Sequence, residues 1–198
     1  MDLQSPKITV GLSQINNSFS GANYLPYSVG LLQAYVEKHL PCKERFKFLQ
    51  PVFKRTSVED VVNQLLSAEV VGFSLYVWNE QISLEIIRQL KKQNPKVYII
   101  CGGPQVPDRA ESFLRKNPEI DIAVHGEGER TFFELLKIFP SRKINQIPGT
   151  SKITESGAFY SNPKADRTKD LSTFPSPYLS GVFDNLISIP DEEWLVLW

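Results

Sequence analysis

The strongest constraint on the fold is a repeated alternation of short apolar runs with stretches of helical periodicity. The apolar runs lie at residues 8–15, 46–52, 70–76, 97–101 and 121–125. Helical patterns follow at residues 27–39, 57–66, 79–94, 108–116 and 126–138. The run at 70–76 is almost entirely apolar, which is typical of a strand covered on both faces. Repeated strand–helix units predict a parallel sheet between two layers of helices, a three-layer α/β/α fold.

Local signals predict where two of the helices begin and how the chain is divided. Ser57 and Asp60 have the spacing of a capping box, and Asn79 is a candidate N-cap. The 198 residues suffice for one domain with some additional chain. We expect a domain over 1–140, a hairpin with a proline-containing extended linker over 141–190, and the start of a further unit at 191–198.

The hairpin is predicted from segments 152–154 and 158–160, which flank a turn at Gly157. The linker is predicted over 171–181, which contains Pro175 and Pro177. The apolar run 194–198 has no evident strand partner, and unpaired apolar edges recruit other chains. We therefore expect the natural protein to continue beyond Trp198.

Composition argues against several classes of partner. The 22 Lys and Arg residues balance the 22 Asp and Glu residues, so no basic surface for nucleic acid or membrane is expected. No apolar run approaches the roughly 20 residues of a membrane span. Cys42 and Cys101 are too few for a disulfide framework or a four-ligand metal site, and Cys101 is expected in the core. A polar N-terminus without a secretory signal favours a cytoplasmic protein.

Ligands of open parallel sheets bind beyond the carboxyl ends of the strands. One such end carries Gly102 and Gly103, which can admit a bulky flat group or simply form a tight strand-to-helix turn. We expect a positive φ at Gly102, and we expect Gly103→Val to obstruct a ligand without preventing folding. Ser74 interrupts an apolar strand, and its hydroxyl can bond a ligand nitrogen or a nearby carbonyl.

The segment that follows the fifth strand also has two interpretations. Backbone N–H groups at Gly126 and Gly128 precede a helix and can receive a phosphate. Glu127 and Glu129 place negative charge at the same helix end, which stabilises the helix but repels an anion. His125 lies at a strand end, but a single histidine is a weak indication of a metal site.

Other nucleotide-binding folds are disfavoured by missing motifs. There is no G-x-G-x-x-G after the first strand and no G-x-x-x-x-G-K-[ST] anywhere. Receiver domains need acidic residues where this chain has Gln14, Asn16, Tyr76 and Asn79. The segment 13–22 lacks the compact hydroxyl-rich phosphate loop of flavodoxins.

Four segments in register resemble the cobalamin-binding domain that precedes the catalytic barrel in cobalamin-dependent radical S-adenosylmethionine (SAM) enzymes. They read LPYSVGLL at 25–32, VGFSLYVWN at 71–79, IICGGPQ at 99–105 and VHGEGERTF at 124–132. The segment FPSPYLSG at 174–181 is also similar to the linker of that family. The resemblance implies a flavodoxin-like five-stranded parallel sheet in the order 2-1-3-4-5.

The resemblance also implies a cofactor, cobalamin, with its corrin ring across the strand ends and its benzimidazole tail in a slot of the sheet. By resemblance Ser74 lies beside the tail, Gly102 and Gly103 give it room, and 126–129 meet the nucleotide loop. The implied cofactor-binding residues are Asn17, Ser18, Ser74, Tyr76, Asn79, Gly102, Gly103, Pro104, Gln105, Gly126, Glu127 and Gly128.

Two motifs of related proteins are missing. The D-x-H-x-x-G motif that supplies a histidine to cobalt is absent, so no protein nitrogen is expected on the metal, and Asn17, Ser18 or a water is expected below it. The C-x-x-x-C-x-x-C motif of the iron–sulfur cluster is absent as well. The family places it shortly after a strand like 194–198. We therefore expect the motif beyond Trp198, in a radical SAM domain that holds a [4Fe-4S] cluster and SAM.

The resemblance thus predicts a cofactor-carrying module of a methyltransferase-type enzyme, with no catalytic residues and no activity of its own. The alternative is a flavodoxin-like interaction domain that carries no cofactor, because fold alone does not fix function.

Overall fold

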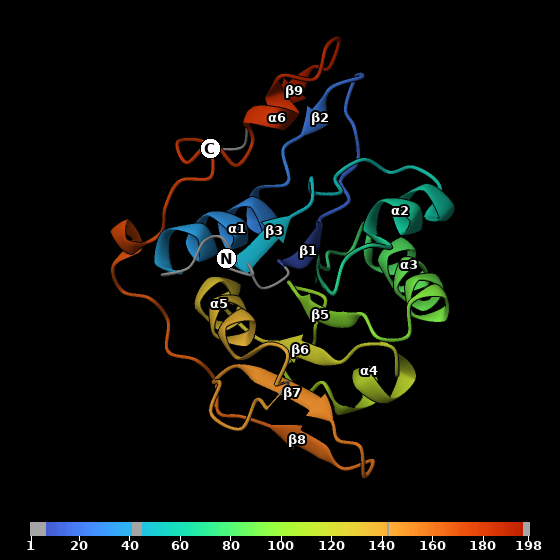
Figure 1. The fold of residues 1–198 in the computed structure, drawn as a ribbon, viewed down its shortest axis with the longest axis vertical. Coiled ribbons are helices and arrows are strands. Elements are labelled where there is room, and N and C mark those ends of the chain that lie inside the picture. Colours follow the sequence, from blue (N-terminus) through green and yellow to red (C-terminus); the bar gives the residue numbers. More distant parts are fainter. Residues whose placement is uncertain (1–6, 41–44, 142, 196–198) are drawn as a thin grey trace, which may run out of the picture.

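The structure, a computed structural model, describes residues 7–40, 45–141 and 143–195. Helices and strands alternate along most of this length (Figure 1). The strands are β1 (Ile8–Ser13), β2 (Asn23–Tyr24), β3 (Phe46–Phe48), β4 (Val70–Ser74), β5 (Tyr98–Gly102), β6 (Ile122–Val124), β7 (Thr150–Ile153), β8 (Phe159–Ser161) and β9 (Trp194–Leu195). The helices are α1 (Tyr27–His39), α2 (Val58–Leu65), α3 (Glu80–Gln93), α4 (Glu111–Lys116), α5 (Gly128–Ile138) and α6 (Asp184–Ile187), with a 3-10 turn, η2, at Leu171–Thr173.

The main sheet has seven strands in the order β3-β1-β4-β5-β6-β7-β8. The first five are parallel and follow the predicted order, so the flavodoxin-like arrangement is confirmed. The sheet differs from the five-stranded prediction because the predicted hairpin, β7 and β8, adds two antiparallel strands beside β6. The register of β4 and β5 sets Ser74 beside Gly102 at the carboxyl edge.

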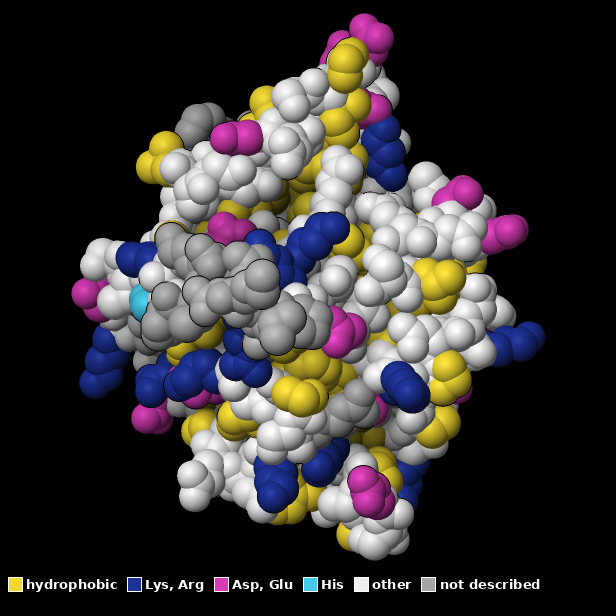
Figure 2. Space-filling view, viewed as in Figure 1, with side chains coloured by type: hydrophobic (Ala, Val, Ile, Leu, Met, Phe, Trp, Pro, Cys, Tyr) yellow, Lys and Arg dark blue, Asp and Glu magenta, His cyan; other side chains and the backbone are white. Residues whose placement is uncertain are grey.

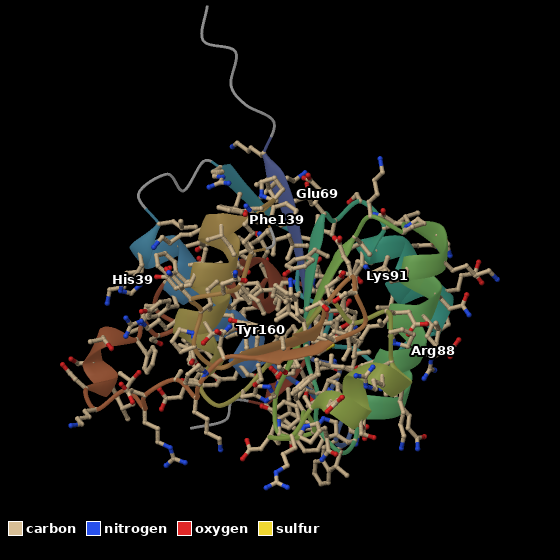
Figure 3. All side chains as sticks on the ribbon, turned by 90° about the horizontal axis from the view of Figure 1, so that it is seen from below. His39, Glu69, Arg88, Lys91, Phe139 and Tyr160 are labelled. Carbon is tan, nitrogen blue, oxygen red and sulfur yellow. The ribbon has the colours of Figure 1, made fainter. Side chains whose placement is uncertain are left out.

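Two layers of helices cover the sheet. In Figure 1, α1 and α5 lie on one side of the strands and α2 and α3 on the other. Figure 3 shows the same division from below, with His39 of α1 on one side and Arg88 and Lys91 of α3 on the opposite side. Each layer encloses its own apolar cluster, because successive side chains of a strand point to opposite faces.

The predicted helix starts had different outcomes. Ser57 caps α2 as predicted: its hydroxyl oxygen accepts a hydrogen bond from the N–H of Asp60 at 3.1 Å. Asn79 occupies the N-cap position of α3 as predicted, but its side chain makes no capping hydrogen bond. The amide of Asn79 is instead engaged with the ends of β1 and β4, as described below.

The chain after β8 runs along the α1/α5 side and returns to β2 (Figure 1). The segment 171–181, predicted as an extended linker, forms η2 and turns that pack on α1 through Tyr27–Tyr178 and Tyr35–Phe174 ring contacts. Phe183 is fully buried against the place where Gly30 lacks a side chain. β9 pairs in parallel with β2, so the strand predicted to be unpaired has a partner. The rest of the predicted run 194–198, and Cys42, lie outside the described residues.

Figure 2 shows one face of the molecule, in which Lys and Arg side chains are spread among Asp and Glu. Among the helices of the described residues, none combines the length and apolarity of a membrane span.

Candidate functional site

A pocket of about 410 Å³ opens at the carboxyl ends of β4, β5 and β6, on the side of the sheet covered by α1 and α5. Its size lies within the usual range of small-molecule sites. The residues that line it come from α1, from β4, β5 and β6, from the loops that follow these three strands, and from the first turns of α5. They are Ser28, Leu32, Gly72, Phe73, Ser74, Tyr76, Ile100, Gly102, Gly103, Pro104, Val106, Asp108, Val124, Gly126, Glu127, Gly128, Glu129 and Phe132.

Along β4 the side chains that face α1 and α5 become small toward the carboxyl end. Val70 belongs to the apolar cluster on this side, but the next residues on the same face are Gly72 and Ser74. On the other face of the strand, Val71 and Phe73 remain bulky and buried. At Gly72 the missing side chain makes room for Leu12 and Phe132, which lie 2.9 and 3.3 Å from where a Cβ atom would stand. At Ser74 the small side chain borders the pocket, and the core on the other side is not interrupted.

β5 has the same gradient in side-chain size. Tyr98 and Ile100 fill the α1/α5 side, and the strand then ends at Gly102. A Cβ atom added to Gly102 would make only an ordinary contact with Val124, 3.7 Å away. Because Gly102 lies beside Ser74, the missing side chain widens the pocket at its polar end.

The structure corrects the predicted roles of the two glycines. Gly103, rather than Gly102, has a positive φ, +97°. A Cβ on Gly103 would lie 2.6 Å from the carbonyl oxygen of Leu75, because the loop after β5 approaches the backbone of β4 closely. This geometry argues against the expectation that Gly103→Val leaves the protein foldable, and Gly102 is the position at which a side chain has room.

A cluster of hydroxyl groups forms the polar end of the pocket. Ser74 is only 7% exposed, and its oxygen lies 3.2 Å from the hydroxyl oxygen of Ser28 on α1. The Tyr76 hydroxyl also donates to Ser28, at 3.2 Å, and the Ser28 hydroxyl donates to Oε1 of Gln14 at 2.7 Å. The remaining walls are mostly apolar, so these hydroxyl groups would fix the orientation of a ligand.

Asn79 does not line the pocket but holds the loop that forms one side of it. Its Oδ1 accepts from the N–H of Tyr76 at 2.8 Å, and its Nδ2 donates to the carbonyls of Ile15 and Ser74 at 2.9 and 3.1 Å. The side chain is 1% exposed, so these bonds use an amide that has no access to a ligand. Gln105 lies outside the lining as well, and its N–H donates to the carbonyl of Leu75 at 3.1 Å.

The loop after β1 lies farther from the pocket. Asn17 and Ser18 are exposed and do not line it. Arg55, which the sequence did not single out, donates to Oδ1 of Asn17 at 3.2 Å and to the carbonyl of Trp78. The ring of Trp78 stacks on Tyr76 with centroids 4.5 Å apart. This arrangement connects three loops at the carboxyl edge of the sheet.

Three acidic side chains line the pocket: Asp108 comes from the loop after β5, and Glu127 and Glu129 lie at the start of α5. The N–H of Thr168 donates to the Glu127 carboxylate at 2.8 Å, which attaches the chain after β8 to the rim of the pocket. The Glu129 side chain is half-buried, and one of its oxygens has no hydrogen-bond partner. Burial is the main cause that raises the pKa of Glu129. Carboxylates here would repel an anion but can accept N–H or O–H donors of a ligand.

His125 faces away from this pocket. Its Nε2 lies 2.8 Å from the Ser151 hydroxyl of β7, and the residue is 8% exposed. Burial lowers the pKa of His125.

Cys101 is fully buried, as predicted, and burial raises its pKa far above the usual range. Within the described chain, His, Cys, Asp and Glu side chains form no group of three or more that could hold a metal.

The structure brings most of the predicted site residues together. Those that line the pocket are Ser74, Tyr76, Gly102, Gly103, Pro104, Gly126, Glu127 and Gly128. Sequence reasoning missed Ser28 and Leu32, although both lie in the segment 25–32 that carried the resemblance. Their spacing of four residues sets them on one face of α1, which was the available signal.

The comparisons with known proteins agree with this location. A family model described as the B12 binding domain matches residues 8–136, which include every residue that lines the pocket. The chain belongs to the B12-binding domain family. The match ends within α5, before the antiparallel hairpin β7–β8.

Two curated relatives match most of the chain. The cobalamin-dependent radical SAM methyltransferase TokK of Streptomyces tokunonensis is 35% identical over 91% of the chain. The 2-(S-pantetheinyl)-carbapenam-3-carboxylate methyltransferase of Streptantibioticus cattleyicolor is 32% identical over the same share. In both comparisons the chain spans only 28% of the relative's length.

Solved structures show the same fold at lower identity. The cobalamin-dependent SAM radical enzyme OxsB, with aqua-cobalamin and SAM bound, gives a TM-score of 0.69 at 21% identity, covering 89% of this chain and 25% of that one. The radical SAM methyltransferase TsrM of Kitasatospora setae, with cobalamin and a [4Fe-4S] cluster bound, gives 0.62 at 20% identity, covering 86% and 31%.

Proposed function

We propose that this domain binds cobalamin, with the benzimidazole base of the nucleotide tail in the 410 Å³ pocket and the corrin ring above the carboxyl ends of the strands. The observation that carries the proposal is the coincidence of this pocket with the segment that matches the B12-binding family. Cobalamin, when bound, supplies a cobalt centre that can carry a methyl group. The side chains of this domain position and shield the cofactor.

The pocket suits a flat heteroaromatic base. A side chain at Gly102 would project into the pocket, and the glycine leaves this space open. At one end the hydroxyl group of Ser74 can bond a ring nitrogen, and the hydroxyl groups of Ser28 and Tyr76 lie next to it. The apolar side chains of the walls can pack against the faces of a ring: Leu32, Ile100, Val106, Val124 and Phe132.

The predicted cofactor-binding residues take different roles in this proposal. Ser74, Tyr76 and Gly102 contact the base, and Gly103 with Pro104 forms the turn over it. The loop containing Gly126, Glu127 and Gly128 faces the sugar and amide groups of the cofactor. Asn79 and Gln105 act indirectly, by holding the loops in place, which is supported by their hydrogen bonds to backbone groups.

The lower face of cobalt is proposed to lack a protein nitrogen, with Asn17, Ser18 or a water beneath it. The sequence contains two histidines. His39 lies at the carboxyl end of α1 and His125 is bonded to Ser151, and this arrangement supports the proposal. The paramagnetic resonance spectrum of the cobalt(II) form should show no nitrogen splitting on its high-field lines. Splitting that disappears in His125→Ala would contradict the proposal.

We also propose that the domain works as part of a longer radical SAM enzyme of the methyltransferase type. Its relatives bear that description, and the chain spans about a quarter of their length. In this proposal residues 1–140 form the cofactor domain, 141–190 the connection, and 191–198 the start of a barrel that holds the [4Fe-4S] cluster and SAM. The native gene should then encode C-x-x-x-C-x-x-C within a few tens of residues after Trp198.

Cofactor retention provides the direct test. Purified protein mixed with hydroxocobalamin should keep the visible absorbance of the corrin after desalting, in about equimolar amount. The alternative, an interaction domain without a cofactor, is not favoured by the family match. Complete loss of absorbance from folded protein would favour it.

A further inference from the structure

A chain of three hydroxyl groups connects the pocket to the start of α1. Ser74 and Tyr76 both approach the hydroxyl oxygen of Ser28, each at 3.2 Å. The Ser28 hydroxyl in turn donates its proton to Oε1 of Gln14 at 2.7 Å. The three hydroxyl groups line the pocket, whereas Gln14 is 6% exposed and lies behind them.

Gln14 is anchored independently of these hydroxyl groups. α1 follows Pro26, whose side chain cannot cap the helix. Oε1 of Gln14 takes that role and accepts from the N–H groups of Ser28 and Val29 at 2.9 and 3.4 Å. These two backbone donors keep the Gln14 oxygen satisfied even if the Ser28 hydroxyl turns elsewhere.

The single proton of each hydroxyl group permits two arrangements with the same heavy-atom positions. While Ser28 donates to Gln14, its oxygen can only accept, so the proton of Ser74 points to Ser28 and the lone pairs of Ser74 face the pocket. If Ser28 instead donates to Ser74, the proton of Ser74 is available to the pocket. Tyr76 donates to Ser28 in both arrangements.

We propose that Ser28 is a positioning residue that turns Ser74 into a hydrogen-bond donor when a heteroaromatic base with an acceptor nitrogen enters the pocket. The hydroxyl groups then donate in one direction, from Tyr76 to Ser28, to Ser74 and to the ligand, and aligned hydrogen bonds strengthen one another. This inference rests on the proposed binding of the cobalamin tail and adds the residue that adjusts the pocket to the base.

The test compares two corrinoids, cobalamin and cobinamide, of which the second lacks the nucleotide tail. In Ser28→Ala the N–H groups that bond Gln14 remain, and alanine suits a helix. The Kd for cobalamin should rise about three- to tenfold, the loss expected for one hydrogen bond, while the Kd for cobinamide should not change. Ser112→Ala is the matched control, because Ser112 is exposed and is also the second residue of its helix, α4.

The outcomes separate this inference from the proposed function. An unchanged Kd for cobalamin in Ser28→Ala, or an equal loss for both corrinoids, would overturn the inference. Equal affinity of the wild type for both corrinoids would also overturn the inference, but it would leave the proposed binding of cobalamin intact. A folded wild type that binds neither would contradict the proposed function itself. If Ser28→Ala does not fold, Ser28→Cys, which keeps the size but donates weakly, should show the same selective loss.

Discussion

On the α2/α3 face of the sheet, buried apolar side chains continue to the carboxyl ends of β4 and β5. On the α1/α5 face they give way to Gly72, Ser74 and Gly102. Both faces are built from the same strands, and the difference arises only from alternate residues. The α2/α3 face therefore stabilises the fold throughout its length, whereas the α1/α5 face becomes a pocket near its end.

The comparison shows that a binding site can arise where large side chains are absent from one face of a sheet. The backbone of β4 and β5 stays regular, and the pocket lies where this face carries the small residues Ser74 of β4 and Gly102 of β5 side by side. Substitutions on one face should therefore change the free energy of unfolding, and substitutions on the other should change ligand affinity. The following predictions test this separation.

Gly103→Val should have the largest effect, although Gly103 lines the pocket. Its φ of +97° disfavours any side chain, and its Cβ would collide with the backbone of Leu75 at 2.6 Å. The free energy of unfolding should fall by about 3 kcal/mol or more, measured by urea denaturation without ligand. A folded variant of wild-type stability would show that this turn can move away from β4.

Ile86→Ala tests the packed face. Ile86 of α3 is fully buried in the cluster on the α2/α3 side. Truncation leaves a cavity in the core, so the free energy of unfolding should fall by about 2–5 kcal/mol. Cobalamin affinity, measured by titration of the folded fraction, should remain at the wild-type value. A parallel loss of affinity would mean that the two faces are coupled.

Gly102→Val is the converse test on the pocket face. The added Cβ meets Val124 at an ordinary 3.7 Å, and valine suits a strand, so the fold should persist. The rest of the side chain would occupy the pocket, so the Kd for cobalamin should rise by roughly tenfold, equivalent to about 1.4 kcal/mol. Gly102→Ala adds less volume and should give a smaller loss. An unchanged Kd in folded Gly102→Val would mean that the tail lies elsewhere.

The sequence predicted the features that depend on local periodicity. The apolar runs, the helical stripes and the Ser57 cap were sufficient to derive five parallel strands between helices. A pocket lies at the edge of the sheet that the motifs indicated. The hairpin was also recognised, but its attachment to β6 was not, because pairing with a distant strand leaves no periodic signal. The same reason explains why the two-residue pair β2–β9 was missed.

The finer details of the site depend on contacts between distant segments. Which of the two glycines needs a positive φ is decided by the approach of Leu75, which belongs to another strand end. In the sequence, Gln14 served only to exclude a receiver domain, which needs an acidic residue there. Its role as the acceptor for the first N–H groups of α1 depends on the start of that helix lying next to it. Ser28 had a usable signal, its spacing from Leu32, but its partners Ser74 and Tyr76 come from a different strand end.

Glu129→Gln should have the smallest effect, and its direction follows from pH. Burial raises the pKa of Glu129 despite its position in the first turn of α5, where negative charge is favourable. The folded protein therefore binds a proton that the unfolded chain has released, over the pH range from the usual glutamate pKa of about 4.3 up to the raised value. The wild type loses stability as the pH rises through that range.

Glu129→Gln has no ionisable group at this position, so its free energy of unfolding should not fall in this way as the pH rises. At pH 7.5, ligand-free Glu129→Gln should be more stable than the wild type by less than about 1 kcal/mol, because the side chain is only half-buried. Below about pH 4, where glutamate is protonated in both states, this pH-dependent advantage should disappear. Parallel urea titrations of both proteins from pH 3 to pH 8 measure the difference. An advantage that grows toward acid pH would show that the pKa is lowered instead, and that this end of the pocket is better solvated than its burial indicates.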